Sequence, residues 1–222
     1  MKLAHYFFRE PFEWNDQNIH TLVIENPVLY RNFISGMIEQ QSGMDGMFVL
    51  SNDNEIIDFH KNVELITDIF RVSPSENKKI INAIQKELTD IANHDFPHEL
   101  SELYCKIHAL LSDTVFSCGM DITFDEINDI SPIIKLYNVR PDTEDHSLLG
   151  KLLIYMELCE KYLKKKLFII LNLHSCCSQE ELDCFFKDIV YRKNNILLLE
   201  THLEDASKYE KVLIVDKDMC EI

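Results

Sequence analysis

The apolar run LFIIL at residues 167–171 constrains the fold more than any other feature of the chain. A strand that is apolar on both faces must be covered on both, which is typical of the centre of a parallel sheet. The segments on either side, HSLLGKLLIYMELCEKYL and LDCFFKDIVY, carry apolar residues at helical spacing, and NNILLLE and KVLIVD then predict further strands. This alternation predicts an α/β fold built on a parallel sheet.

Turn residues are scarce in this chain. Five glycines and six prolines among 222 residues are too few for the many tight turns of an all-β sandwich or barrel. Apolar residues make up 46% of the chain, which is enough for a substantial core. We therefore expect helices and strands joined by loops of moderate length.

The first 70 residues also predict mixed structure. LAHYFF and TLVIE are typical of strands, and Asn26 followed by Pro27 is typical of a helix start. MFVLS and EIIDFH predict a hairpin across SNDN, and VELITDIF predicts another strand. We expect residues 1–70 and 142–222 to form the two parts of one α/β head domain.

Residues 71–141 predict a helical domain inserted into the head, which we call the leg. SPSE at Ser73–Glu76 matches a capping box, so a helix is expected to begin there. Two amphipathic stripes follow, separated by NHDFP at residues 93–97, and they predict an antiparallel pair of helices. The stripes comprise Ile80, Ile81, Ile84, Leu88 and Ile91, then Leu100, Leu103, Tyr104, Ile107, Leu110, Leu111 and Val115.

Charge and cysteine content exclude several classes of protein. A formal net charge of -16 discourages nonspecific binding to nucleic acid or to an anionic membrane. The seven cysteines show no C-x-x-C spacing, and the amino terminus lacks the apolar core of a signal peptide. We expect a soluble cytoplasmic protein with free thiols and no membrane partner.

Common nucleotide and zinc motifs are absent from the sequence. Neither G-x-x-x-x-G-K-S/T nor G-x-G-x-x-G occurs, which argues against nucleotide hydrolysis. His174, Cys176, Cys177 and Cys184 lack the second cysteine pair of a zinc site, so ordinary core or loop thiols are favoured. A Cys and His nucleophile pair would be equally unspecific.

The segment GMDITFDEINDISP at residues 119–132 concentrates acidic side chains at Asp121, Asp125, Glu126 and Asp129. Thr123 and Glu126 match a capping box, so a helix over DEINDISPIIKLY would explain Asp125 and Glu126 locally. Hard oxygen ligands on a loop and a first helical turn also suit calcium, although no EF-hand pattern is present. Spacing alone leaves both a solvated face and a calcium site open.

Basic residues gather in two places. Lys161, Lys164, Lys165 and Lys166 end a predicted helix, where cations favour the helix dipole. Lys78, Lys79 and Lys86 form a second basic face. Neither group by itself indicates DNA binding.

Taken in order, these elements resemble the type II-A CRISPR-associated spacer-acquisition family. The resemblance covers nearly the whole chain and is densest at residues 121–140 and 152–200, with YLKKKLFIILN the most specific segment. It implies a head related to P-loop folds without the nucleotide loop, and an inserted leg. It also implies a non-catalytic, calcium-stabilised homotetrameric ring that encloses ends of double-stranded DNA. The implied partners are the integrase complex and the effector nuclease of the same locus.

The resemblance assigns roles to particular residues. It implies that Asp121, Asp125, Glu126 and Asp129 are calcium ligands. It further implies that Lys135 and Arg140, followed by Lys78, Lys79 and Lys86, contact DNA phosphates. Pro132 departs from the family pattern and is expected to shorten or kink the helix that carries Lys135.

Two other functions remain open on the sequence. One is an enzyme of α/β fold, either a metal-dependent nuclease that uses the same carboxylates or a degenerate nucleotide hydrolase. The other is an interaction scaffold whose acidic residues form a solvated face.

Overall fold

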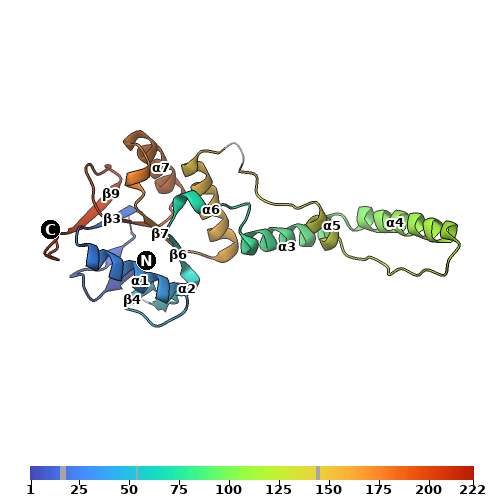
Figure 1. The fold of residues 1–222 in the computed structure, drawn as a ribbon, viewed down its shortest axis with the longest axis horizontal. Helices are drawn as coiled ribbons and strands as arrows, with labels where there is room; N and C mark the ends of the chain where they lie inside the picture. Colours follow the sequence, from blue (N-terminus) through green and yellow to red (C-terminus); the bar gives the residue numbers. More distant parts are fainter. Residues whose placement is uncertain (16–18, 54, 144–145) are drawn as a thin grey trace. The chain divides into compact units, whose positions relative to one another are not determined.

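The structure is a computed structural model that describes residues 1–15, 19–53, 55–143 and 146–222 (Figure 1). The chain divides into two compact units, one formed by residues 1–74 and 143–222 and the other by residues 75–142. We call these units the head and the leg and describe each by itself.

A parallel sheet of five strands organises the head. Its order is β6-β7-β8-β3-β9, and every neighbouring pair is parallel. The strands are β3 (Ile19–Ile24), β6 (Val63–Ile66), β7 (Leu167–Leu171), β8 (Ile196–Glu200) and β9 (Glu210–Val215). Because β3, β7 and β8 are buried along their whole length, the prediction of an α/β fold with a parallel sheet is confirmed.

Helices cover both faces of this sheet (Figure 1). On one face, Phe33 and Met37 of α1 (Pro27–Gln41) belong to a core cluster that includes residues from all three central strands. These strand residues include Leu22 of β3, Ile169 of β7 and Leu197 of β8. The cluster therefore lies between α1 and the parallel sheet.

The other face of the sheet lies under α6 (Leu148–Leu163) and α7 (Gln179–Arg192). The buried side chains of these two helices are Leu149, Leu152, Met156, Cys159, Leu182, Phe185, Phe186 and Ile189. With apolar helix faces on both sides, the central strands are removed from water, as their sequence requires.

A second, antiparallel sheet completes the head. Its order is β2-β1-β4-β5, formed by β1 (Lys2–His5), β2 (Phe12–Glu13), β4 (Phe48–Asn52) and β5 (Glu55–Ile57). The predicted hairpin is confirmed, since Leu50 pairs with Ile57 in antiparallel register. Its second strand is shorter than expected, because Asp58 caps a short helix, α2 (Phe59–Asn62), immediately after Ile57.

Local capping explains where helices of the head begin. The Asn26 side chain accepts hydrogen bonds from the amides of Val28 and Leu29, both at 3.0 Å, as predicted. Ser178 and Glu181 form the predicted capping box at the start of α7. Two 3₁₀ turns, η1 (Ile69–Arg71) and η2 (His174–Cys176), complete the helical elements of the described part of the head.

The capping box predicted at Ser73–Glu76 is wrong. The first leg helix, α3 (Lys78–Asp95), begins later, and Asn77 caps it by accepting from the amides of Lys79 at 3.1 Å and Ile80 at 3.3 Å. Asparagine caps at least as well as serine, and Asn77 lies directly before the apolar stripe that starts at Ile80.

The predicted antiparallel helix pair is also wrong. Only Phe96 separates α3 from α4 (Pro97–Cys118), and one residue is too short for the usual reversal between two helices. No residue of α4 is buried. Figure 1 instead shows α4 continuing away from α3, with residues 119–130 running back toward α5 (Ser131–Leu136).

Residues 119–130 form no helix, so the helix predicted over residues 125–137 and its capping box at Thr123 and Glu126 are wrong. The helix α5 begins only at Ser131, because Pro132 is tolerated only in the first turn of a helix. The expectation that Pro132 shortens this helix is confirmed. Gly119 ends α4 with a left-handed backbone (φ 65°), a conformation that glycine adopts without strain.

None of the helices in the described part of the chain combines the length and apolar character needed to cross a bilayer.

Candidate functional surfaces

The four predicted calcium ligands lie on the extended segment 119–130 of the leg. Asp121, Asp125, Glu126 and Asp129 are all exposed. Asp129 accepts a hydrogen bond from the Ser131 amide at 2.9 Å, which stabilises the start of α5. Glu126 lies 4.0 Å from His108 of α4, measured between Oε1 and Nδ1.

These carboxylates do not converge within one chain. Among the described residues, no group of three or more His, Cys, Asp or Glu side chains could hold a metal ion. A calcium ion needs six to eight oxygen ligands, so the acidic residues of a single leg do not fit a complete site. Calcium binding by these residues stays a prediction.

Ring contacts hold the acidic segment against α4. The rings of His108 and Phe124 lie 5.8 Å apart in an edge-on arrangement. Nearer to α5, burial and the charge of Asp129 raise the pKa of Tyr104. The Tyr104 hydroxyl is buried and has no hydrogen-bond partner among the described residues. The segment therefore runs antiparallel to α4, with its acidic side chains still open to solvent.

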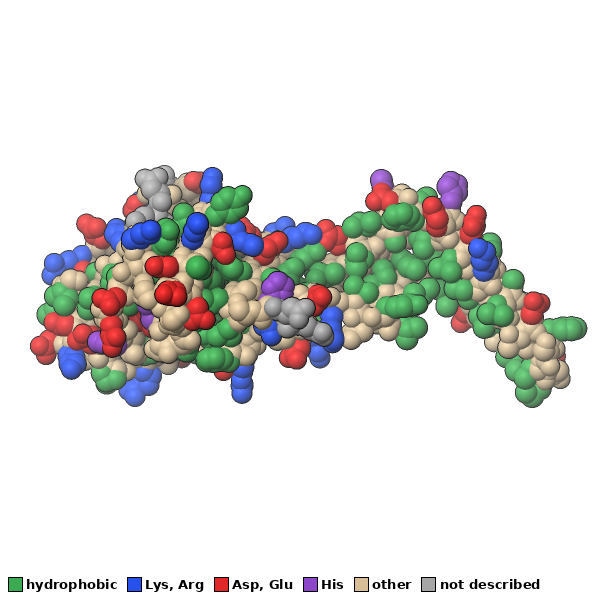
Figure 2. Space-filling model, turned by 90° about the horizontal axis from the view of Figure 1, so that it is seen from above, with side chains coloured by type: hydrophobic (Ala, Val, Ile, Leu, Met, Phe, Trp, Pro, Cys, Tyr) green, Lys and Arg blue, Asp and Glu red, His purple; other side chains and the backbone are tan. Residues whose placement is uncertain are grey.

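Apolar side chains remain exposed along this part of the leg, as the space-filling view shows (Figure 2). We call them the leg apolar surface, and they are Leu103, Leu110, Leu111, Phe116, Met120, Ile122, Phe124 and Ile127. Phe116 is 89% exposed and Leu110 is 69% exposed. A helix of this kind gains most of its stability from burying its apolar face, and exposure on this scale is typical of an interaction surface.

The predicted DNA-contacting residues are exposed on the leg. Lys78, Lys79 and Lys86 lie on α3, Lys135 lies on α5, and Arg140 follows α5. The Gln85 side chain donates to the Val139 carbonyl at 3.5 Å, which brings the chain near Lys86 close to the chain near Arg140. The first turn of α3 contains no acidic residue.

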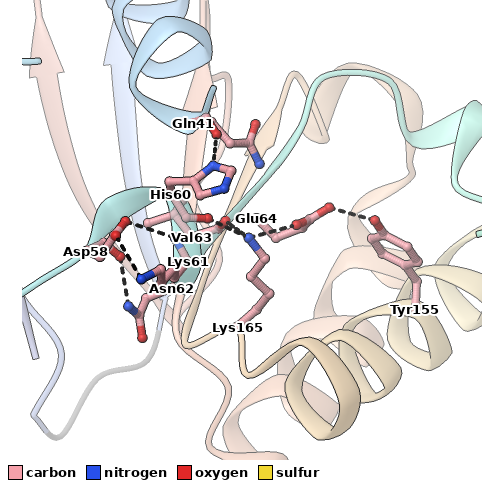
Figure 3. Close-up of polar contacts among 9 residues, drawn as sticks. All are labelled: Gln41, Asp58, His60, Lys61, Asn62, Val63, Glu64, Tyr155 and Lys165. Carbon is pink, nitrogen blue, oxygen red and sulfur yellow. Dashed lines mark hydrogen bonds and ion pairs between the residues drawn. The ribbon is translucent and has the colours of Figure 1, made fainter. Parts of the chain in front are cut away.

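The lysine run at the end of α6 has two different roles. Lys165 is nearly buried, and its ammonium group donates to the carbonyls of Val63 at 2.6 Å and His60 at 2.9 Å (Figure 3). It also lies 3.5 Å from a carboxylate oxygen of Glu64. Lys164 and Lys166 are exposed. The middle lysine therefore joins the end of α6 to the chain around β6 and is not available to a partner. Lys164 is the one that donates to a carbonyl of α6, that of Lys161 at 2.9 Å, as the helix-end interpretation predicted.

The junction between β3 and α1 has no room for a phosphate-binding loop. Only Glu25 and Asn26 separate the strand from the helix. The backbone amides of Val28 and Leu29 already donate hydrogen bonds to the Asn26 side chain. Free amides at the start of a helix are the groups that bind a phosphate in such folds. The geometry agrees with the absence of the nucleotide motif from the sequence.

The sequence did not predict a polar cluster in the head that His174, Glu200 and Glu210 form. His174, which the sequence suggested only as a zinc ligand or a catalytic base, lies 2.9 Å from Glu210, measured between Nε2 and Oε1. Its own amide donates to Glu200 at 3.1 Å. Glu200 is the one acidic residue of the otherwise apolar strand ILLLE. An acidic residue in a buried strand is unusual, and this could have indicated a polar site there.

Comparison with known proteins identifies the family. The family model described as CRISPR-associated protein (Cas_Csn2) matches residues 40–219, most of the head and the whole leg. A search of curated proteins gave no match. The matched range includes the acidic segment and the lysine run that carried the resemblance. The chain belongs to the Csn2 family of CRISPR-associated proteins, which act in antiviral defence.

Proposed function

We propose that this protein binds ends of double-stranded DNA in the cytoplasm during spacer acquisition, as a calcium-stabilised homotetrameric ring. Binding is independent of sequence and non-catalytic, and the protein works with the integrase complex and effector nuclease of its locus. The observation that carries the proposal is the positive first turn of α3 in a strongly acidic chain.

Lys78 and Lys79 occupy a position that costs the helix stability. The amino end of a helix already carries partial positive charge, so cations there are unfavourable by a few tenths of a kcal/mol. Both lysines are nevertheless exposed there without an acidic neighbour in the same turn. A phosphate would be attracted by both ammonium groups and by the helix end.

Self-association is supported by the leg apolar surface. A second leg would cover these side chains and remove them from water. A homotetramer also accounts for DNA binding by a chain of net charge -16, because lysines can line the inner wall while acidic residues face outward.

Calcium is proposed as an ion shared between legs. The acidic residues described in one chain do not form a complete ligand set, and a second leg would supply further oxygens. The ion would neutralise carboxylates that otherwise repel one another.

Sizing the native protein by light scattering, in calcium and in excess chelator, tests the assembly. Gel shifts with linear and closed circular DNA then test end binding. We expect a calcium-dependent tetramer that binds linear DNA and not circles. Unchanged size and gel shift in chelator would contradict the calcium part, and equal binding of circles would contradict end binding. Cleavage of linear DNA with magnesium or manganese would show an enzyme instead.

A further inference from the structure

Two buried carboxylates lie on the α7 side of the parallel sheet in the head. Glu200 ends β8 and is 0% exposed, and one of its oxygens, Oε2, has no hydrogen-bond partner among the described residues. The Glu210 side chain, at the start of β9, is also 0% exposed. Buried carboxylates are costly unless they are neutralised by a cation or a proton.

His174 contacts both glutamates. Its Nε2 atom bonds to Glu210 at 2.9 Å, and its backbone amide bonds to Glu200 at 3.1 Å. Its side chain is 9% exposed. A protonated His174 can neutralise one carboxylate, so the second must carry a proton to avoid a buried net charge.

The segment Thr201–Tyr209, between β8 and β9, is fastened to this cluster by Ser207. The Ser207 amide donates to Glu210 at 2.8 Å, and its hydroxyl donates to Asp183 of α7 at 2.5 Å. Glu210 also accepts from Thr21 of β3 at 2.5 Å. His202, Leu203, Glu204 and Asp205 of this segment line a cavity of about 400 Å³, and His174 also lines it.

We propose that His174, Glu200 and Glu210 form a proton-operated latch on the segment Thr201–Tyr209. With protons on His174 and Glu200, the cluster is neutral overall and the segment stays closed over it. When these protons leave at higher pH, two buried anions remain beside a neutral imidazole, and their hydration requires the segment to open.

Among the described residues, the groups around the cluster include no lysine or arginine that could replace the lost positive charge. The titratable side chains that face the cluster or line the adjoining cavity are Tyr30 of α1, Glu181 and Asp183 of α7, Cys177, and His202, Glu204 and Asp205 of the segment itself. Burial and the charge of Glu200 raise the pKa of Tyr30 to about 12. Burial and nearby acidic groups raise the pKa of Cys177 to about 11.

Amide hydrogen exchange of the full-length protein tests the latch. Wild type and Glu200→Gln are compared at about pH 6 and about pH 8.5, with rates corrected for intrinsic exchange. Protection of residues 201–209 in wild type should fall at least ~10-fold at the higher pH. Glu200→Gln, which mimics the protonated carboxyl, should lose less than ~3-fold.

Peptides from residues 33–41 of α1 serve as the internal control, because they belong to the same unit, pack on the opposite face of the sheet and exclude Tyr30. Equal protection of residues 201–209 at both pH values in wild type would overturn the proposal. An identical loss in wild type and Glu200→Gln would overturn the role of Glu200. The wild-type profile decides the matter even if the variant does not fold.

Discussion

The Tyr155 hydroxyl donates a 2.6 Å hydrogen bond to Glu64, and the carboxylate that accepts it also lies 3.5 Å from the ammonium group of Lys165. Glu64 is on the edge strand β6, whereas Tyr155 is on α6 and Lys165 follows that helix. This carboxylate therefore joins an element that precedes the leg in sequence to one that follows it.

Removing the cation from this network should destabilise the head. Lys165→Met leaves Glu64 nearly buried without its positive partner, so we expect a loss of about 3 kcal/mol in the free energy of unfolding. Urea unfolding followed by the fluorescence of Trp14, which is buried in the head, measures the change. Lys166→Met is the matched control and should cost less than about 0.5 kcal/mol, because Lys166 is exposed. Equal losses in the two variants would contradict the role of Lys165.

The stability of the head should depend on pH through Glu200. Burial raises the pKa of Glu200 to about 7, above its ordinary value of 4.5. The folded state thus binds this proton more tightly than the unfolded state does. The contribution of Glu200 to the free energy of unfolding is therefore fully present below pH 4.5 and is lost as pH rises to about 7. We expect Glu200→Gln to remove about 3 kcal/mol of this decline. Glu204→Gln, an exposed change nearby, should keep the wild-type profile.

DNA binding should depend on the first turn of α3. Replacing Lys78 and Lys79 together by alanine removes two phosphate contacts, so affinity for linear DNA should fall ~10-fold or more, equally for unrelated sequences. The slope of log affinity against log salt should shrink by about 2. Lys187→Ala on α7 is the control for an exposed lysine of the head. An unchanged salt dependence would show that these lysines do not meet phosphates.

Assembly should depend on the leg apolar surface. Leu110→Glu and Phe116→Glu place charges on exposed apolar positions, so each should lower the mass measured by light scattering without unfolding the protein. Tyr191→Glu on α7 is the control, since Tyr191 is 87% exposed in the head. If the leg variants assemble like wild type, this surface does not mediate self-association.

Calcium dependence should reside in the acidic segment. The double change Asp125→Asn and Asp129→Asn keeps the size of both side chains and removes their charges, so the calcium-dependent change in size should disappear. Asp113→Asn on α4 is a control within the same leg. A normal response to calcium in the double variant would favour a purely solvated acidic face.

Local signals in the sequence predicted those parts of the fold that depend on a few neighbouring residues. Asn26 before Pro27, the capping box at Ser178–Glu181 and the apolar strand at residues 167–171 are each confirmed, because each of these signals acts within a few residues. The family resemblance is confirmed over residues 40–219.

Competition between local signals explains the errors. The sequence analysis placed the cap at Ser73, but the helix is capped by Asn77, which lies nearer to the apolar stripe. Thr123 and Glu126 have the spacing of a capping box, but Pro132 allows a helix only from Ser131 onward. The cluster of His174, Glu200 and Glu210 could not be predicted, because 26 and 36 positions separate His174 from its partners.

The order of strands in the parallel sheet also governs when the head can fold on the ribosome. The neighbours of the buried strand β3 in this sheet are β8 and β9, so the residues of the entire leg must be translated before either neighbour exists. At common synthesis rates this delay lasts roughly 10–30 s. During that interval β3 has neither of its neighbours in the sheet. If synthesis stops within the leg, the exposed strand is a target for chaperones and proteases.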